Sequence, residues 1–235
     1  AAANIALAGE TLRRRAGPAA APRGVDLRPR VWFNPDLESR NYYVPGIIAM
    51  LVMLVGLMLT SMAIVREKET GTIEQIMVTP IRPVEFILGK CAPFAVVGLI
   101  DTALVSAVGL FWFDIPFRGS FALLLLGTAL FLLGTLGIGL FISTVSRTQQ
   151  QAMMTTFFFF FPAMLFSGFI FPISSMPEPF QWLSLADPLR HFLVIIRGVF
   201  LKGVGAEVLW PELAALLGMG AAVMAFAVSR FRKTL

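Results

Sequence analysis

Few side chains in this sequence could carry out catalysis. The sequence holds one cysteine, Cys91, and one histidine, His191. A catalytic triad, a zinc site or a disulfide needs more of these side chains, and neither G-x-S-x-G nor H-E-x-x-H occurs. Gly89 and Lys90 lack the upstream glycine and the following Ser or Thr of a phosphate-binding loop. We therefore expect that this chain is not an enzyme and binds no metal and no cofactor of its own.

Asp101 lies near the middle of a long apolar segment, residues 86–113. An ionised side chain at such a depth in a membrane costs about 3 kcal/mol or more unless it faces a bundle interior, a partner or water. Asp101 is therefore either a carboxylate on a substrate or proton path, or a hydrogen-bonded packing residue between helices. Phe158 and Phe161, in the run Phe157 to Phe161, are aromatic candidates for a hydrophobic path, with lipid contact or helix packing as the alternative.

The composition predicts a membrane protein with several spans. Hydrophobic residues make up 57% of the chain, charged residues make up 14%, and the mean hydropathy is +0.80. These values lie outside the range of ordinary soluble domains. The net charge of +5 does not indicate nucleic-acid binding, because 7 of the 19 Lys and Arg residues precede residue 41 and no basic stripe alternates with aromatic residues.

Five apolar segments are long enough to cross a bilayer core of about 30 Å at about 1.5 Å per helical residue. They cover residues 44–65, 86–113, 121–145, 152–172 and 208–228. The predicted fold is an all-α membrane helix bundle over residues 44–235, with residues 1–43 forming the end of an extracytoplasmic domain or tail. Small residues repeat on two of the spans and predict close helix packing or a dimer seam; they are Gly127 and Gly134, and Ala214, Gly218 and Ala222.

A charged segment, REKETGTIEQIMVTPIRP, occupies residues 66–83 between the first two spans. Thr72 and Gln75 match a capping box, which predicts a short helix from about Ile73 to Thr79, ahead of Pro80. The charges of Glu67, Lys68, Glu69 and Glu74 and the apolar face of that helix would suit a soluble protein partner. The alternative is an interfacial helix that lies on the lipid headgroups.

A second unusual segment, residues 173–205, separates the last two spans. Ser175 with Glu178 matches a capping box, and Asp187-Pro188 supplies an N-cap followed by proline at the first helical position. We expect two short helices, near Pro177 to Leu185 and Pro188 to Leu201, each too short to cross a membrane. A re-entrant helical hairpin in the outer leaflet would accommodate both.

Lys and Arg in the short loops predict the orientation, because such residues are enriched on the cytoplasmic side. Eight of them fall on the side of residues 66–90, Arg147 and the C-terminus, and four fall on the opposite side. The charged segment and the C-terminus are therefore predicted to be cytoplasmic.

The run REKETGTIEQIMVTPIRP, with the preceding FNPDLESRNYYVPGIIAMLV and the later ADPLRHF, resembles the ABC-2 family of export permeases, most closely its bacterial multidrug-export branch. In that family a first helix and a large outer domain precede these segments, so we expect this chain to be the C-terminal part of a longer permease. The resemblance implies that residues 66–83 form a coupling helix region that docks on an ATP-hydrolysing subunit. The residues that match this element are Glu67, Lys68, Glu69, Thr70, Gly71, Thr72, Glu74 and Gln75.

The resemblance also implies the partners. An ATP-binding cassette subunit would bind ATP and Mg²⁺, and a second permease chain, identical or different, would complete a path for hydrophobic or amphipathic compounds such as drugs. Membrane lipid and a periplasmic adaptor are further expected partners, and the location is the bacterial plasma membrane. The alternative is an ATPase-independent membrane scaffold or channel-like assembly subunit.

Overall fold

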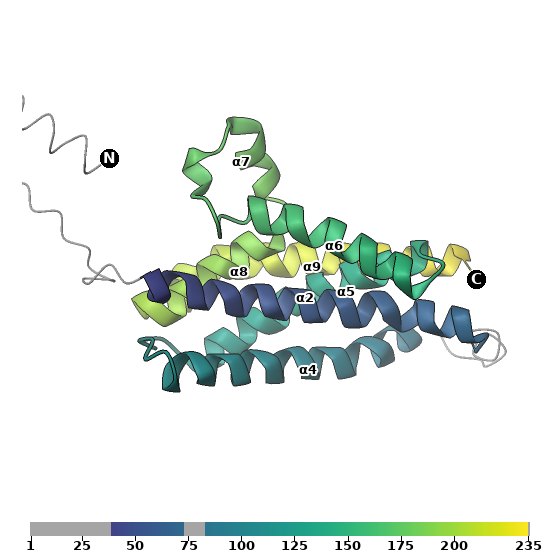
Figure 1. The fold of residues 1–235 in the computed structure, drawn as a ribbon, viewed down its shortest axis with the longest axis horizontal. Helices are drawn as coiled ribbons and strands as arrows, with labels where there is room; N and C mark the ends of the chain where they lie inside the picture. The colour runs from purple at the N-terminus through teal and green to yellow at the C-terminus, as the bar shows by residue number, and fades with distance from the viewer. Residues whose placement is uncertain (1–38, 73–82, 235) are drawn as a thin grey trace, which may run out of the picture. The chain divides into compact units, whose positions relative to one another are not determined.

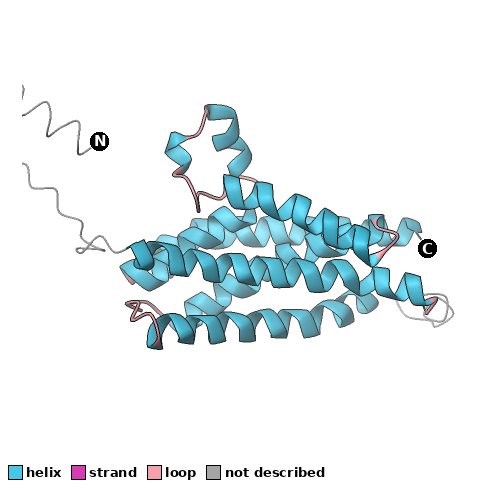
Figure 2. Cartoon of the chain, in the orientation of Figure 1, coloured by secondary structure: helices cyan, strands magenta, loops and turns pink. Residues whose placement is uncertain are grey.

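The structure is a computed structural model that describes residues 39–72 and 83–234. The chain divides into two units, residues 1–35 and residues 36–235, and the described residues all belong to the second. All regular secondary structure within the described ranges is helical (Figure 2). The helical part of the predicted fold class is therefore confirmed.

Within the described ranges, four helices are long and apolar enough to cross a membrane. They are α2 (Ser39–Thr70), α4 (Pro83–Phe111), α5 (Phe121–Val145) and α9 (Ala206–Thr234), and they run alongside one another (Figure 1). The predicted span at residues 152–172 corresponds to α6 (Gln149–Phe166), which has 18 residues and ends before the predicted limit. Three glutamines begin α6 and lower its hydropathy, so a fifth span stays a prediction.

The end of α2 differs from the prediction, which placed the start of a loop at Arg66. The helix continues to Thr70 and ends where Gly71 adopts a φ of 73°. Gly71 N donates to Lys68 O at 3.3 Å and Thr72 N donates to Glu67 O at 3.1 Å, the two bonds of a Schellman motif. The charged residues after Val65 are good helix formers, so the helix ends at the glycine instead of at the first charge.

The start of α6 also differs from the prediction, which began the span at residue 152. Thr148 is the N-cap of α6, and its side chain accepts a hydrogen bond from Gln151 N at 3.1 Å. The Gln151 side chain accepts in return from Arg147 N at 2.8 Å. This reciprocal arrangement resembles a capping box, and it starts the helix three residues before the predicted span.

The segment after α6 forms two unlike helices. The first, α7 (Glu178–Ser184), stands apart from the bundle, whereas α8 (Pro188–Arg197) packs within it (Figure 1). The predicted N-cap at Asp187 is confirmed, because its carboxylate accepts from Leu189 N at 3.0 Å. The predicted Ser175–Glu178 capping box is wrong: Ser175 lies in the short 3₁₀ helix η1 (Ile173–Ser175), and Pro177 precedes α7 without a side-chain cap. Beyond α8 the chain forms a π-helical turn, η2 (Gly198–Lys202).

Helix α5 lies at the centre of the core and packs against α2, α4, α8 and α9. The α5–α9 contact is close because Gly134 faces Gly220, where an added Cβ would lie 3.6 Å from the opposite Cα. Gly127 similarly faces Ile195 of α8. The predicted close packing of the glycine row on α5 is therefore confirmed, and it joins helices within one chain. Gly218 of α9 has open space instead.

Candidate functional site

Three consecutive charged residues at the end of α2 contact three different helices. The Glu67 carboxylate pairs with the ammonium group of Lys90 in the first turns of α4. Lys68 Nζ donates to the backbone carbonyls of Ser143 and Thr144, at 3.4 and 3.1 Å, at the end of α5. Glu69 Oε1 accepts from Gln149 N at 2.9 Å at the start of α6, and its second oxygen accepts from the Gln149 side chain. We call these residues and their partners the α2 junction.

The helix dipoles explain the order of charges in the junction. The C-terminus of a helix carries partial negative charge and favours a cation, and the N-terminus favours an anion. Lys68 meets the free carbonyls at the end of α5, and Glu69 meets a free N–H at the start of α6. Lys68 and Glu69 therefore each satisfy a backbone group at the end of a neighbouring helix that has no partner within that helix.

Ser143 joins α5 to α2 a second time, and more deeply. Its side chain is fully buried, and Ser143 Oγ accepts from Ile64 N at 3.2 Å and from Val65 N at 3.1 Å. Because the carbonyl of the same residue accepts from Lys68, the end of α5 is held to the last turns of α2 by both side-chain and backbone groups. The two helix ends are expected to move together.

The remaining predicted coupling residues continue from the junction toward the solvent. Thr70 and Thr72 are exposed, and their hydroxyl groups lie 3.1 Å apart on either side of Gly71. Glu74, Gln75 and the helix predicted for residues 73–79 lie outside the described residues. Their part in docking stays a prediction. Glu67, Lys68 and Glu69 each form hydrogen bonds within the chain, while the second carboxylate oxygen of Glu67 is buried without a partner among the described residues.

The three predicted substrate-path residues do not share one site. Phe158 is 81% exposed and lines an apolar groove between α5, α6 and α9. Phe161 lies outside this lining and stacks against the ring of Phe157 at a centroid distance of 6.0 Å. Asp101 lies on α4, where one carboxylate oxygen is buried without a hydrogen-bond partner in the described part of the chain. A path through all three residues stays a prediction.

A second polar cluster lies around α8. The ring of His191 contacts the Glu212 carboxylate of α9 through Nδ1 and the Leu185 carbonyl through Nε2, the latter at 3.0 Å. Arg190 Nη1 donates to Gln181 O at 3.3 Å. Burial raises the pKa of Asp187 to about 7, against the lowering effects of the Leu189 N–H and of Arg190. The cluster holds α7, α8 and α9 together.

The sequence gives no signal for most of the partners in these clusters. Ser143, Glu212 and Gln149 are ordinary residues of predicted spans and loops, and only the three-dimensional structure places them beside Lys68, His191 and Glu69. One signal was overlooked: Thr148 and Gln151 have the T-x-x-Q spacing of a capping box, which marks the start of α6.

Residues 2–229 match the family described as "ABC-2 family transporter protein". The chain belongs to this family. The resemblance drawn from the charged segment is thereby confirmed, since the ABC-2 match spans far more than half of the sequence.

Curated members of the ABC-2 family agree. The chain is 35% identical to "Probable multidrug ABC transporter permease YbhR" of Escherichia coli over 212 residues, which is 90% of this chain and 58% of that protein. It is 37% identical to "Probable multidrug ABC transporter permease YbhS" over 180 residues, 76% of this chain and 48% of that protein. It is 32% identical to "Inner membrane transport permease YhhJ" over 216 residues, 90% and 57% respectively. The chain thus spans about half the length of these relatives.

Proposed function

We propose that this ABC-2 chain is the membrane part of a permease subunit in an ATP-driven exporter of the bacterial inner membrane. Two relatives are named as probable multidrug ABC transporter permeases and a third as an inner membrane transport permease. The four long apolar helices suit a protein with several membrane spans. The exported compounds would be hydrophobic or amphipathic, and a separate cytoplasmic subunit would bind ATP and Mg²⁺ and hydrolyse the nucleotide.

The observation that carries the mechanism is the α2 junction. Residues 73–82 connect α2 to α4, and the proposed coupling helix lies within this connection. The charges just before it are bonded to α4, α5 and α6. A push on the connection would therefore reach three helices at once, and α5 would carry it to α9, against which α5 packs along its length. Docking and transmission are in this way assigned to neighbouring but different residues.

The proposed arrangement in the membrane follows from the loop charges. The α2 junction faces the cytoplasm with the C-terminus of α9, and α7 with α8 forms the re-entrant hairpin on the outer side. A second permease chain would complete the transport path. The alternative, a scaffold or channel-like subunit that works without an ATPase, has no observation in its favour.

The test separates docking from transmission. The permease is co-expressed with candidate ATP-binding cassette subunits from the same organism, and capture of the ATPase, ATP turnover and export of a lipophilic dye are measured. Glu74→Lys reverses a charge on the proposed docking helix, and we expect about tenfold weaker capture, equivalent to about 1.4 kcal/mol. Glu67→Gln with Glu69→Gln removes the negative charge from two ties of the junction, which weakens them, and should leave capture intact while lowering the export obtained per ATP hydrolysed.

Two further variants make the result specific. Exchanging the pair, Glu67→Lys with Lys90→Glu, should restore part of the coupling lost in Glu67→Gln because the ion pair can form again in reverse. Glu178→Lys makes the same charge change on α7 and should alter neither capture nor coupling. If no Walker-type ATPase is captured by the unmodified chain, the proposed function is wrong. If the double variant exports with normal efficiency, the role of the junction is wrong.

A further inference from the structure

An apolar groove of about 460 Å³ runs between α5, α6 and α9. Phe141 and Ile142 come from α5, Phe158 and Phe159 from α6, and Val223 and Phe226 from α9. The volume falls in the range of small-molecule sites, about 300–1,000 Å³, and apolar and aromatic lining is typical of them. Thr155 is the polar residue of the lining, and its hydroxyl donates to Gln151 O at 2.9 Å. The lining is thus suited to hydrocarbon and offers no counterion to a charged group.

In the proposed membrane arrangement, in which α6 is a fifth membrane span, the groove lies within one leaflet. At about 1.5 Å per residue, the α6 residues of the lining, Thr155 to Phe159, lie roughly 9 to 15 Å along α6 from Gln149, where that helix begins. Half of a bilayer's apolar core measures about 15 Å. The groove therefore lies in the deeper part of the leaflet. An acyl chain that extends from the groove toward the start of α6 would place its polar headgroup near the first turn of that helix.

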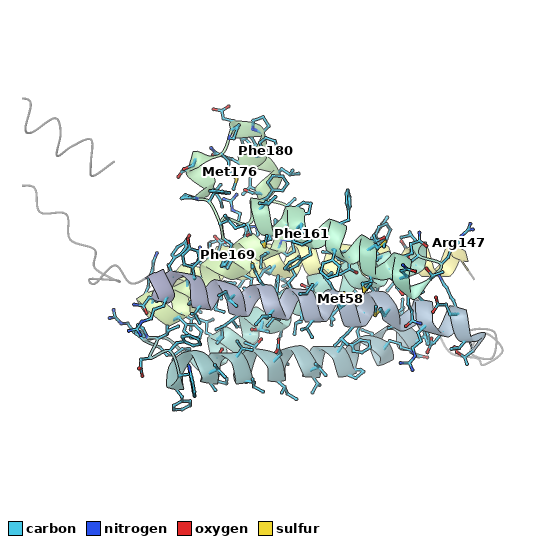
Figure 3. The ribbon with its side chains drawn as sticks, viewed as in Figure 1. Met58, Arg147, Phe161, Phe169, Met176 and Phe180 are labelled. Atoms are coloured by element: carbon cyan, nitrogen blue, oxygen red, sulfur yellow. The ribbon has the colours of Figure 1, made fainter. Side chains whose placement is uncertain are left out.

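A positively charged side chain, Arg147, lies beside the start of α6, where the polar end of such a ligand would be. Arg147 is exposed in the turn between α5 and α6, and no described residue forms a salt bridge with it. Figure 3 shows Arg147 at the end of the bundle where α9 also ends. The acidic neighbour on the other side of the α6 start, Glu69, is bonded to Gln149.

The geometry points to a binding site for an anionic phospholipid, with an acyl chain in the groove and the headgroup phosphate at Arg147. Basic residues at the ends of membrane helices, above a gap between those helices, are the recurring means by which membrane proteins hold anionic headgroups. A second copy of the chain is the competing occupant of the groove, and the experiment below distinguishes it from a phospholipid. The site does not depend on transport and is separate from the α2 junction contacts.

The experiment places a fluorescent reporter in the groove. Phe226→Trp is introduced into the complete protein, which is reconstituted into nanodiscs containing either phosphatidylglycerol or phosphatidylcholine with the same brominated acyl chains. Bromine quenches tryptophan on contact, and the protein without the added Trp supplies the background from its 4 native Trp residues. We expect half-maximal quenching at about fivefold lower mole fraction of phosphatidylglycerol, the preference expected for one basic residue near an anionic headgroup.

Arg147→Gln should reduce the fivefold preference for phosphatidylglycerol to a ratio of about one. Added salt should weaken the preference in the parent protein, because Arg147 is exposed to solvent. Arg118→Gln, in the exposed turn between α4 and α5 at the other end of α5, is the matched control and should leave it unchanged. Should Phe226→Trp fail to fold, the phospholipids that remain on the unmodified and Arg147→Gln proteins are compared by native mass spectrometry, with phosphatidylglycerol expected to be depleted in the variant.

Equal quenching by the two lipids overturns the proposal, as does a preference that survives Arg147→Gln. Protection of the reporter from both lipids, together with disulfide cross-linking between two Phe226→Cys chains, would also overturn it and assign the groove to a second copy. Quenching by phosphatidylglycerol that is displaced only by an anionic amphipathic compound, and not by unbrominated phosphatidylglycerol, would assign the site to a transported compound instead.

Discussion

The two ends of the helix bundle are held together by different means. Besides the buried Ser143 hydroxyl, the α2 junction consists of charged side chains, partly or fully exposed, that bond to the ends of neighbouring helices. Near the start of α2, α8 instead buries an apolar face against α2, α5 and α9, with Leu189, Phe192 and Ile195 fully buried. Water can replace the hydrogen bonds of an exposed junction, whereas nothing replaces the packing of a buried helix.

This difference indicates which end can move. Exposed polar ties contribute little to stability, since their groups bond to water when the tie breaks. Buried contacts such as those of α8 contribute several kilocalories per mole per large side chain. A junction that transmits movement needs contacts that can break and form again, whereas a helix that holds the bundle together needs contacts that persist. We therefore expect changes at α8 to unfold the protein and changes at the α2 junction to affect its movement more than its stability.

The largest effect is expected from Phe192→Ala. Phe192 stacks on Phe131 of α5 with ring centroids 4.4 Å apart, and both side chains are fully buried. Removing such a ring leaves a cavity that the neighbours fill only in part, at a cost of about 3–5 kcal/mol. Unfolding in detergent, followed by circular dichroism, measures it. Phe111→Ala removes the same ring from an 85% exposed position and should cost far less; equal losses would contradict the anchoring role of α8.

A smaller effect should appear in the pH dependence of the protein's stability, through Asp187 at the start of α8. Burial raises the pKa of Asp187 to about 7 from its ordinary value of 3.8, so the folded protein holds this proton to higher pH than the unfolded chain does. Between about pH 4 and pH 7 the unfolded chain has released the proton while the folded protein retains it, and stability falls as the pH rises. Asp187→Asn keeps the N-cap, because Asn caps as well as Asp.

In the Asp187→Asn protein, the fall in stability over this interval should be shallower by up to about 1.4 kcal/mol per pH unit, the value for one proton. Thermal unfolding at several pH values between 4 and 8 measures the slope. The comparison variant is Glu178→Gln, which removes a carboxylate from the exposed helix α7 and should leave the slope unchanged. An unaltered slope in Asp187→Asn would contradict the effect assigned to its burial.

The fold was predictable from the sequence where local residues mark the boundaries of a helix. Helix α5 occupies residues 121–145 as predicted, because a charge-free apolar run there has polar residues at both ends. Helix α2 ends at Thr70, beyond the predicted limit at residue 65. The charges of Arg66 to Glu69 indicate a membrane surface, whereas Gly71 marks the end of the helix. Membrane depth and helix length are separate properties, and the hydropathy of a segment reports only the first.

Only the charged residues of the α2 junction were predictable from the sequence, and the groups that they contact were not. The charges of Glu67, Lys68 and Glu69 were recognisable as functional candidates, but the groups they contact lie on helices whose positions no local pattern fixes. The dipole rule states what kind of partner each charge prefers, a helix C-terminus for Lys68 and an N-terminus for Glu69. It does not state which helix supplies that terminus, because this depends on how the spans pack.

The smallest effect is expected at the α2 junction itself, from Ser143→Ala. The lost hydroxyl accepts from the N–H groups of Ile64 and Val65, and a buried hydrogen bond of this kind contributes about 1 kcal/mol. The Ile64 and Val65 amides should then exchange with deuterium faster, while those of α8 keep their rates. Hydrogen exchange followed by mass spectrometry measures both regions in one sample.

Ser146→Ala is the matched control for this change. Ser146 is also buried and lies one turn further along, but its hydroxyl has no hydrogen-bond partner among the described residues. Its removal should be neutral or slightly stabilising, because a buried polar group without a partner is itself unfavourable. If the two alanine variants exchange alike at residues 64 and 65, the Ser143 hydroxyl does not hold α2 to α5, and the junction would rest on Glu67, Lys68 and Glu69 alone. If only Ser143→Ala loosens these amides while export per ATP also falls, the α2–α5 tie transmits movement at little cost in stability, which is the property that separates this end of the bundle from α8.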